Sequence, residues 1–197
     1  MKQSIVLIAA VMLIAISAFG QSTWTVDNTH SKVKFSVSHL IISEVEGNFN
    51  VYSGMLQSSK SDFSDGVIDF AIDVNSINTD NEGRDKHLKS EDFFNGEKYP
   101  KMTFKSVTWK KVKDQNYLLE GDLTIRDVTK RVTFNVVYGG TIQDPWGNTK
   151  SGFKATTTIN RFDYGLKFNA LTEAGSAVVG KDVNITLNLE FAKQKSS

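Results

Sequence analysis

The 197-residue sequence contains no cysteine, which excludes thiol catalysis, disulfide scaffolds, iron–sulfur clusters and zinc sites built on thiolates. It also has almost no net charge, because 23 Lys and Arg are balanced by 22 Asp and Glu. A general nucleic-acid binder needs a basic face for the phosphates, so we expect no nucleic-acid partner. Proline is scarce, with two residues in the chain. At 40% hydrophobic and 23% charged residues, the composition is that of one ordinary globular domain.

Long apolar runs are also missing, apart from the twelve residues 5–16. Lys2 precedes this run, and the small residues Ala18 and Gly20 follow it at the −3 and −1 positions of a cleavage site. This pattern predicts a signal peptide over 1–20, cleaved between Gly20 and Gln21, and a mature domain over 21–197. The alternative is an uncleaved anchor, but a spanning helix needs about 20 apolar residues. Export from a double-membraned bacterium would place the protein in the periplasm.

The rest of the chain alternates apolar and polar residues with a period of two, as half-buried strands do. In the second alternating segment, Val45, Gly47, Phe49 and Val51 are expected to face inward. The segments are 33–39, 45–51, 68–74, 102–109, 117–125, 132–138, 153–159 and 183–191. The fourth changes phase between Phe104 and Val107, which predicts a β-bulge.

Eight antiparallel strands with one apolar face each form either a sandwich or a closed barrel. We favour the barrel, because closure leaves no edge strand and no segment carries an internal proline to guard one. The predicted fold class is therefore all-β, an extended eight-stranded antiparallel barrel.

One stretch, at about 80–95, breaks the alternation and is predicted to be a short helical insertion over one mouth of the barrel. Thr79–Glu82 has the form of a capping box, so a helix is expected over 82–89. Residues 90–96 are expected to form a second, one-turn helix that ends at Gly96.

Motifs for catalysis and metal binding are lacking. His30 and His39 are nine residues apart, His87 stands beside basic residues, and no metal-binding spacing joins the three histidines. His30 is expected to close a turn. No nucleophile elbow or phosphate-binding glycine loop is present, and the predicted inward faces carry no paired carboxylates. We predict no catalytic residue, no metal site and no cofactor.

The predicted interior is rich in phenylalanine, with Gly47 and Gly121 supplying space. An eight-stranded barrel of this kind can either fill itself with side chains or hold one small ligand. The residues alone leave both alternatives open.

Several segments together resemble the YceI-like family of exported, lipocalin-like barrels. They occur in the family's order along nearly all of the mature chain, and Arg84–Phe94 is the most specific of them. Asp163-Tyr164-Gly165 stands where the family often has Asp-Phe-Gly. The segments are Trp24–Ser31, Val33–Leu40, Val45–Phe49, Ile77–Thr79, Arg84–Phe94, Tyr99–Phe104, Gly121–Ile125 and Asn160–Leu166.

The resemblance implies an extended barrel with a hydrophobic tunnel that binds a polyprenyl lipid or an isoprenoid quinone, and it does not imply catalysis. It also allows transient membrane contact, as a monomer or a homodimer. His39 and Arg161, each at the end of a strand, are candidates for head-group contacts or, equally, for structural hydrogen bonds. The expected ligand-binding residues are Phe35, Val37, His39, Phe49, Phe70, Phe104, Leu123, Phe134, Phe153, Ile159, Arg161, Leu187 and Phe191.

Two other functions stay open. One is an interaction module with a filled barrel, which would lack a continuous internal tunnel. The other is an enzyme acting on a lipid head group at the barrel mouth, which would need His39 or His87 near a carboxylate.

Overall fold

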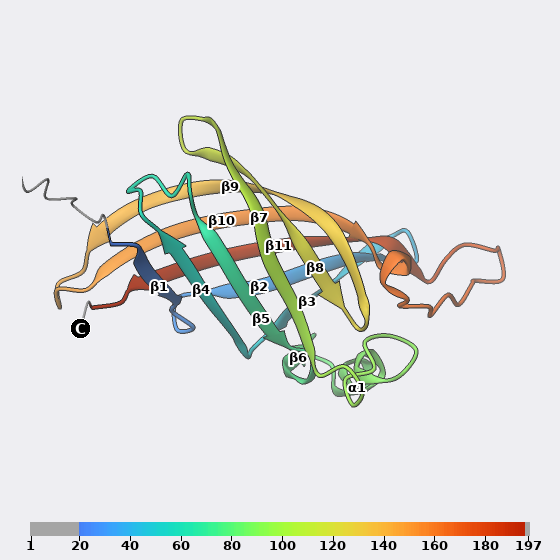
Figure 1. Cartoon of the computed structure of the whole chain (residues 1–197). Coiled ribbons are helices and arrows are strands. Elements are labelled where there is room, and N and C mark those ends of the chain that lie inside the picture. The colour runs from blue at the N-terminus through green and yellow to red at the C-terminus, as the bar shows by residue number, and fades with distance from the viewer. Residues whose placement is uncertain (1–19, 196–197) are drawn as a thin grey trace, which may run out of the picture.

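Long, strongly twisted strands wrap around a common axis, with one short helix at one end (Figure 1). The structure, a computed structural model, describes residues 20–195; the predicted signal peptide lies almost entirely outside them. The helix is α1 (Glu82–Lys89), and two short 3-10 helices are η1 (Val74–Ser76) and η2 (Arg161–Tyr164). The strands are β1 (Ser22–Val26), β2 (Lys32–His39), β3 (Ser43–Phe49), β4 (Tyr52–Ser58), β5 (Val67–Asp73), β6 (Ile77–Asn78), β7 (Lys101–Lys113), β8 (Asn116–Ile125), β9 (Val128–Gln143), β10 (Thr149–Asn160) and β11 (Val179–Lys193).

The sheet closes on itself through β11. Neighbouring strands follow the order β1-β4-β5-β7-β8-β9-β10-β11, and β1 pairs again with β11, with Val26 opposite Phe191. Farther along β11, β2 takes the place of β1, and β3 and β6 continue the wall beyond β2. The pairs β1/β2, β3/β4 and β5/β6 thus act as three interrupted wall strands, and the barrel has eight in total. The predicted eight-stranded antiparallel barrel is confirmed.

The interruption between β3 and β4 overturns one prediction about which side chains point into the barrel. Asn50 and Val51 lie between the two strands, and the alternation changes phase across them, so that Phe49 and Tyr52 are both buried. Val51, which was expected to face inward, is 56% exposed. Its apolar side chain continued the alternating pattern, and the sequence carries no sign of the break.

Two other local predictions have mixed outcomes. The bulge is confirmed, because Ser106 pairs with Gly121 and Thr108 with Glu120, which leaves Val107 as the extra residue. Helix α1 has the predicted bounds, but Thr79 and Glu82 do not form its capping box.

The N-cap is Asn81, whose side chain accepts a hydrogen bond from the Arg84 amide. The Thr79 hydroxyl instead donates to the Asp85 carboxylate at 2.5 Å. Residues 90–96 form turns rather than a helix, with Asn95 in the left-handed region at φ 51°.

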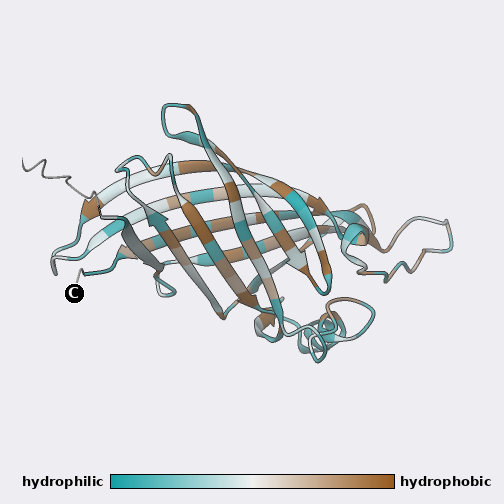
Figure 2. Cartoon of the chain, viewed as in Figure 1, coloured by the Kyte–Doolittle hydropathy of each residue, from teal (hydrophilic) through white to brown (hydrophobic). Residues whose placement is uncertain are grey.

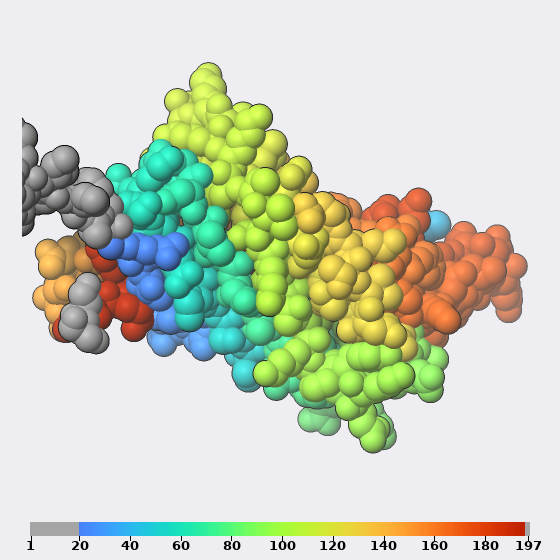
Figure 3. Space-filling view, in the orientation of Figure 1, coloured from blue at the N-terminus to red at the C-terminus, as the bar shows by residue number. Residues whose placement is uncertain are grey.

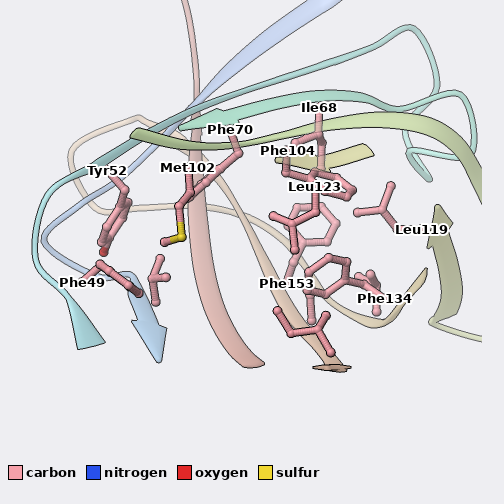
Figure 4. Packing of buried hydrophobic residues seen from close by; sticks show 14 of the residues in the cluster. Phe49, Tyr52, Ile68, Phe70, Met102, Phe104, Leu119, Leu123, Phe134 and Phe153 are labelled. Atoms are coloured by element: carbon pink, nitrogen blue, oxygen red, sulfur yellow. The ribbon is translucent and has the colours of Figure 1, made fainter. Parts of the chain in front are cut away.

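The barrel wall carries apolar side chains inward and polar ones outward, and brown and teal bands alternate along the strands in Figure 2. Figure 4 shows Phe49, Tyr52 and Met102 on one side of the interior, and Phe104, Leu119 and Phe153 farther along. Inward glycines allow some of these rings to lie close to the wall. A Cβ on Gly121 would lie 2.3 Å from Cζ of Phe104, and one on Gly54 would lie 2.3 Å from Cδ2 of Phe70.

Candidate functional site

An internal cavity of about 300 Å³ runs along the barrel axis. This volume reaches the range of small-ligand sites, which is about 300–1,000 Å³. The wall is overwhelmingly apolar, and no Asp or Glu lies among its described lining residues. An elongated hydrocarbon chain can be buried against such a wall without removing water from polar groups of the protein.

Twelve of the thirteen predicted ligand-binding residues lie on this cavity wall. They are Phe35, Val37, His39, Phe49, Phe70, Phe104, Leu123, Phe134, Phe153, Ile159, Arg161 and Leu187. The exception is Phe191, which is 1% exposed and packs behind Phe153 at a ring-centroid distance of 6.0 Å. Phe191 faces inward as predicted but does not line the cavity, because alternation gives the face of a strand and not the depth along the barrel.

Aromatic rings fill the end of the barrel where Phe191 lies. Phe63, from the segment between β4 and β5, is 2% exposed and adopts φ 57°. Its ring centroid lies 5.3 Å from that of Trp24, 5.6 Å from Tyr138 and 5.2 Å from Phe153. The rings meet at steep angles, which is a favourable aromatic geometry. Phe63 therefore plugs one end of the barrel, and the alternating pattern gave no signal for it.

At the opposite end, the cavity reaches α1 and the segment that follows η2. His87, Phe93 and Phe168 form a triangle of rings with centroids 4.9–5.1 Å apart, and all three line the cavity. The sequence predicted an insertion over a mouth, but it gave no reason to bring Phe168 to His87. Ser38, His39, Val178 and Val179 complete the wall at this end, where they are partly or largely exposed.

Arg126 holds the segments of this mouth together. One of its terminal nitrogens donates to the carbonyls of Glu91, Phe93 and Gly165 at 3.3, 3.2 and 2.8 Å. Its guanidinium also lies 5.5 Å from the ring centroid of Tyr99. A single side chain from the β8–β9 turn thus fixes the turn after α1 to the turn after η2.

Arg161 is buried on the cavity wall, with 2% of its surface exposed. Its Nε and two terminal nitrogens donate to the carbonyls of Gly180, Leu166 and Val179 at 2.8, 2.9 and 3.1 Å. Burial lowers the pKa of this guanidinium, which still remains charged because its ordinary value is so high. No described carboxylate pairs with it. The structural role considered for Arg161 is therefore present, and spare N–H groups remain for a ligand oxygen.

The other residues on the wall with polar side-chain atoms are Lys34, Ser38, His39, Arg84, His87, Thr103 and Trp109. His39 lies at the end of β2, where it pairs with Ser43 of β3 and Val179 of β11. His87 Nε2 lies 3.0 Å from the Asp92 carboxylate, so one condition for a head-group enzyme is met at this histidine. Trp109 is 8% exposed, and its indole N–H has no hydrogen-bond partner in the described chain.

A charged cluster outside the cavity joins Asp27, His30 and Glu190 within 4.8 Å of one another. His30 Nδ1 lies 3.1 Å from Asp27, so the histidine closes a turn as predicted. Lys150 Nζ lies 2.5 Å from Asp27 and 3.1 Å from Glu190. Because this ammonium already pairs with both carboxylates, the cluster is an ion network that ties β1 and β11 to β10.

The fold and the cavity define a lipocalin-like barrel, closed by eight wall strands and with an apolar interior that reaches the surface at one end. Residues 24–191 match the YceI-like domain, and the chain belongs to the YceI-like family. The UPF0312 protein SA2479 of Staphylococcus aureus is 40% identical over 174 residues, which cover 87% of this chain and 98% of that protein.

Solved structures show the same barrel. A YCEI protein of Campylobacter jejuni is 32% identical and superimposes with a TM-score of 0.69 over 81% of this chain and 90% of its own. Burkholderia cenocepacia BcnA, at 22% identity, gives a TM-score of 0.73 over 84% and 98% of the two chains. A polyisoprenoid-binding domain from Saccharophagus degradans, at 18% identity, gives 0.66 over 87% and 98%. The last two likenesses concern the fold.

None of the helices in residues 20–195 is both long and apolar enough to span a membrane.

Proposed function

We propose that the protein is a non-enzymatic carrier or store for a long-chain polyisoprenoid, either a polyprenyl lipid or an isoprenoid quinone, in the periplasm. The observation that carries this proposal is the closed barrel whose apolar cavity has no carboxylate on its described wall. Membership of the YceI-like family and the likeness to the polyisoprenoid-binding domain support it. The amino-terminal pattern of Lys2, an apolar run and Gly20 supports export.

Affinity would come mainly from burial of the chain, because each CH₂ removed from water contributes about 0.8 kcal/mol before the cost of ordering it. Selectivity would follow from how much chain the cavity can hold. His39 and the spare N–H groups of Arg161 would contact the oxygen atoms of a head group near the α1 end.

The test is native mass spectrometry of freshly purified protein, followed by organic extraction and mass analysis of the extract. We expect a co-purifying species with isoprene-spaced fragments, or uptake of an added polyprenyl quinone or polyprenyl phosphate after delipidation. A protein that is empty when purified and stays empty after incubation with both compounds would refute the carrier proposal and favour the interaction module.

The hydrogen bond between His87 and Asp92 makes a head-group enzyme the second candidate. A His39→Ala/His87→Ala variant separates the two. For an enzyme, the variant would bind a polyprenyl phosphate but no longer convert it. For a carrier, mass analysis would recover the lipid unchanged from the parent protein as well as from the variant.

A further inference from the structure

The end of the barrel that carries the cavity mouth also exposes a group of large apolar side chains. The turn between β2 and β3 holds Leu40, Ile41 and Ile42, which are 36%, 73% and 86% exposed. The segment 165–178 projects beside this turn and exposes 59% of Leu171 (Figure 1). The Leu40 amide donates to the Val178 carbonyl at 2.9 Å, so the two segments form one surface. In Figure 3 the light-blue turn lies beside the orange and red atoms of that segment.

This surface, which we call the apolar rim, consists of residues 40–43 and 168–180. Within these bounds Glu173 is the single charged residue, whereas 23% of the whole chain is charged. The charged residues that directly adjoin the rim carry no net charge; they are Glu44, Lys167, Lys181 and Asp182. Leu40 and Ile41 also have φ angles of 52° and 66°. This left-handed conformation is costly for bulky residues, and most of all for a β-branched one such as Ile41. Glycine or asparagine would be the ordinary residue there. Leucine and isoleucine at these positions are therefore unfavourable both for exposure to water and for the backbone conformation.

The rim is continuous with the cavity. Ser38 and His39 precede the turn directly, and Phe168, Val178 and Val179 belong to the second segment; all five line the cavity mouth. A long isoprenoid is held in a bilayer by the same hydrophobic effect that would hold it in the barrel. A protein that takes up such a lipid without exposing it to water must bring its mouth to the bilayer surface.

We infer that the apolar rim docks on a phospholipid bilayer and that the lipid enters the barrel between the β2–β3 turn and the 165–178 segment. This inference rests on the proposed carrier function. Because the rim has one charge and the charges that adjoin it cancel, docking depends on insertion of apolar side chains and changes little with salt concentration.

The chain offers a matched pair of variants. Ile41→Asn/Ile42→Asn removes the two most exposed apolar side chains of the rim, and asparagine tolerates the backbone at Ile41. The control is Ile142→Asn/Trp146→Asn, at the end of β9 and in the β9–β10 turn, where the two residues are 68% and 83% exposed. The β9–β10 turn belongs to the opposite end of the barrel (Figure 1).

The experiment measures flotation of each purified protein with phosphatidylcholine vesicles and its rate of polyprenyl quinone uptake from those vesicles. Loss of two inserted isoleucines should lower the vesicle partition coefficient and the uptake rate roughly tenfold or more. The control variant should behave like the parent protein, and raising the salt concentration should change binding little. Quinone binding from detergent solution should be unchanged in both variants.

An Ile41→Asn/Ile42→Asn variant that floats and takes up quinone from vesicles as the parent does would overturn the inference. An equal loss in the control variant would overturn it too, because apolar exposure anywhere would then suffice. Failure of the parent protein to bind quinone from detergent would refute the carrier function instead, and the flotation result would still show whether the rim binds a bilayer.

Discussion

Single residues decide whether the wide aromatic rings of this barrel can lie against its wall. A Cβ added at Gly121 would lie 2.3 Å from Cζ of Phe104 and 2.5 Å from the backbone oxygen of Lys105. Because backbone cannot move aside as a side-chain tip can, we predict that Gly121→Ala lowers the free energy of unfolding by about 1–3 kcal/mol. Urea denaturation checks this. Gly152→Ala is the control, since nothing lies within 4 Å of its added Cβ; equal stability of the two variants would contradict the prediction.

Gly47 makes a related but different prediction. Its added Cβ would lie 2.4 Å from Cζ of Phe35, the far end of a half-buried side chain that lines the cavity, and 2.7 Å from Cγ2 of the buried Thr79. Both neighbours are side chains rather than backbone, and the ring can swing toward the lumen, so we expect Gly47→Ala to cost less stability than Gly121→Ala but to reduce uptake of an added polyprenyl lipid. Titration with a fluorescent polyprenyl analogue, with Gly152→Ala as reference, measures that reduction. Unchanged uptake would mean that the ring does not enter the cavity.

At the scale of elements, the structure of the cavity mouth depends on Arg126, a residue of the β8–β9 turn that joins two other segments. Arg126 donates to carbonyls on both the 91–93 turn and Gly165. We predict that Arg126→Gln increases hydrogen exchange over 82–100 and 161–168 and lowers the free energy of unfolding by about 1.5–3 kcal/mol, the range for a charged hydrogen bond. Arg131→Gln, which breaks an exposed pair with Asp122 on β8 and β9, should leave exchange at the mouth unchanged. Exchange confined to the site of substitution would contradict the role given to Arg126.

Alternation predicted the elements because a closed barrel gives every strand one dry and one wet face. It therefore placed Phe35, Phe104 and Leu123 on the cavity wall correctly. It failed at Val51, where an unpaired step between β3 and β4 reverses the faces. At Phe191 it gave the buried face correctly but not the depth along the barrel, which depends on where the aromatic plug begins.

The mouth was harder to predict for a different reason. His87 and Phe168 are 81 positions apart, and the loop conformations that bring their rings to 4.9 Å have no period to detect. Phe63 enters the far end from a loop in the same way. Local patterns thus gave the wall of the barrel, whereas both of its ends depend on contacts between distant segments.

The barrel closes where β1 pairs with β11. The ion network of Asp27, Lys150 and Glu190 at this closure predicts that the folding stability depends on pH. The ammonium of Lys150, followed by His30 and the Thr29 amide, holds the pKa of Asp27 well below its ordinary value, against the effect of burial. A depressed folded-state pKa stabilises the protein above the unfolded-state value, and this stabilisation is lost as the pH falls below about 4. Asp27→Asn should therefore cost about 1–3 kcal/mol at neutral pH, and less as the pH falls toward 3.

Urea denaturation at neutral pH and near pH 3 measures this difference. Asp69→Asn is the control, because Asp69 and its partner Lys105 are 61% and 72% exposed, and it should change stability little at either pH. A cost for Asp27→Asn that is the same at both pH values would show that the carboxylate's charge does not stabilise the closure.

For the whole molecule, the cavity that allows lipid binding also lowers the folding stability of the empty protein. An apolar cavity costs stability because the atoms lining it lack packing partners, so an empty barrel is less stable than a filled one.

Val183, on β11, is half-buried and lines the cavity. Val183→Phe should raise the melting temperature of the delipidated protein and reduce lipid uptake together. In the parent protein, saturating lipid should raise the melting temperature by mass action, and the variant should show a smaller rise. Val137→Phe, at a position 45% exposed on the outer face of β9, should change neither property. If Val183→Phe stabilised the protein and still bound lipid as the parent does, the lipid would lie elsewhere than in this cavity.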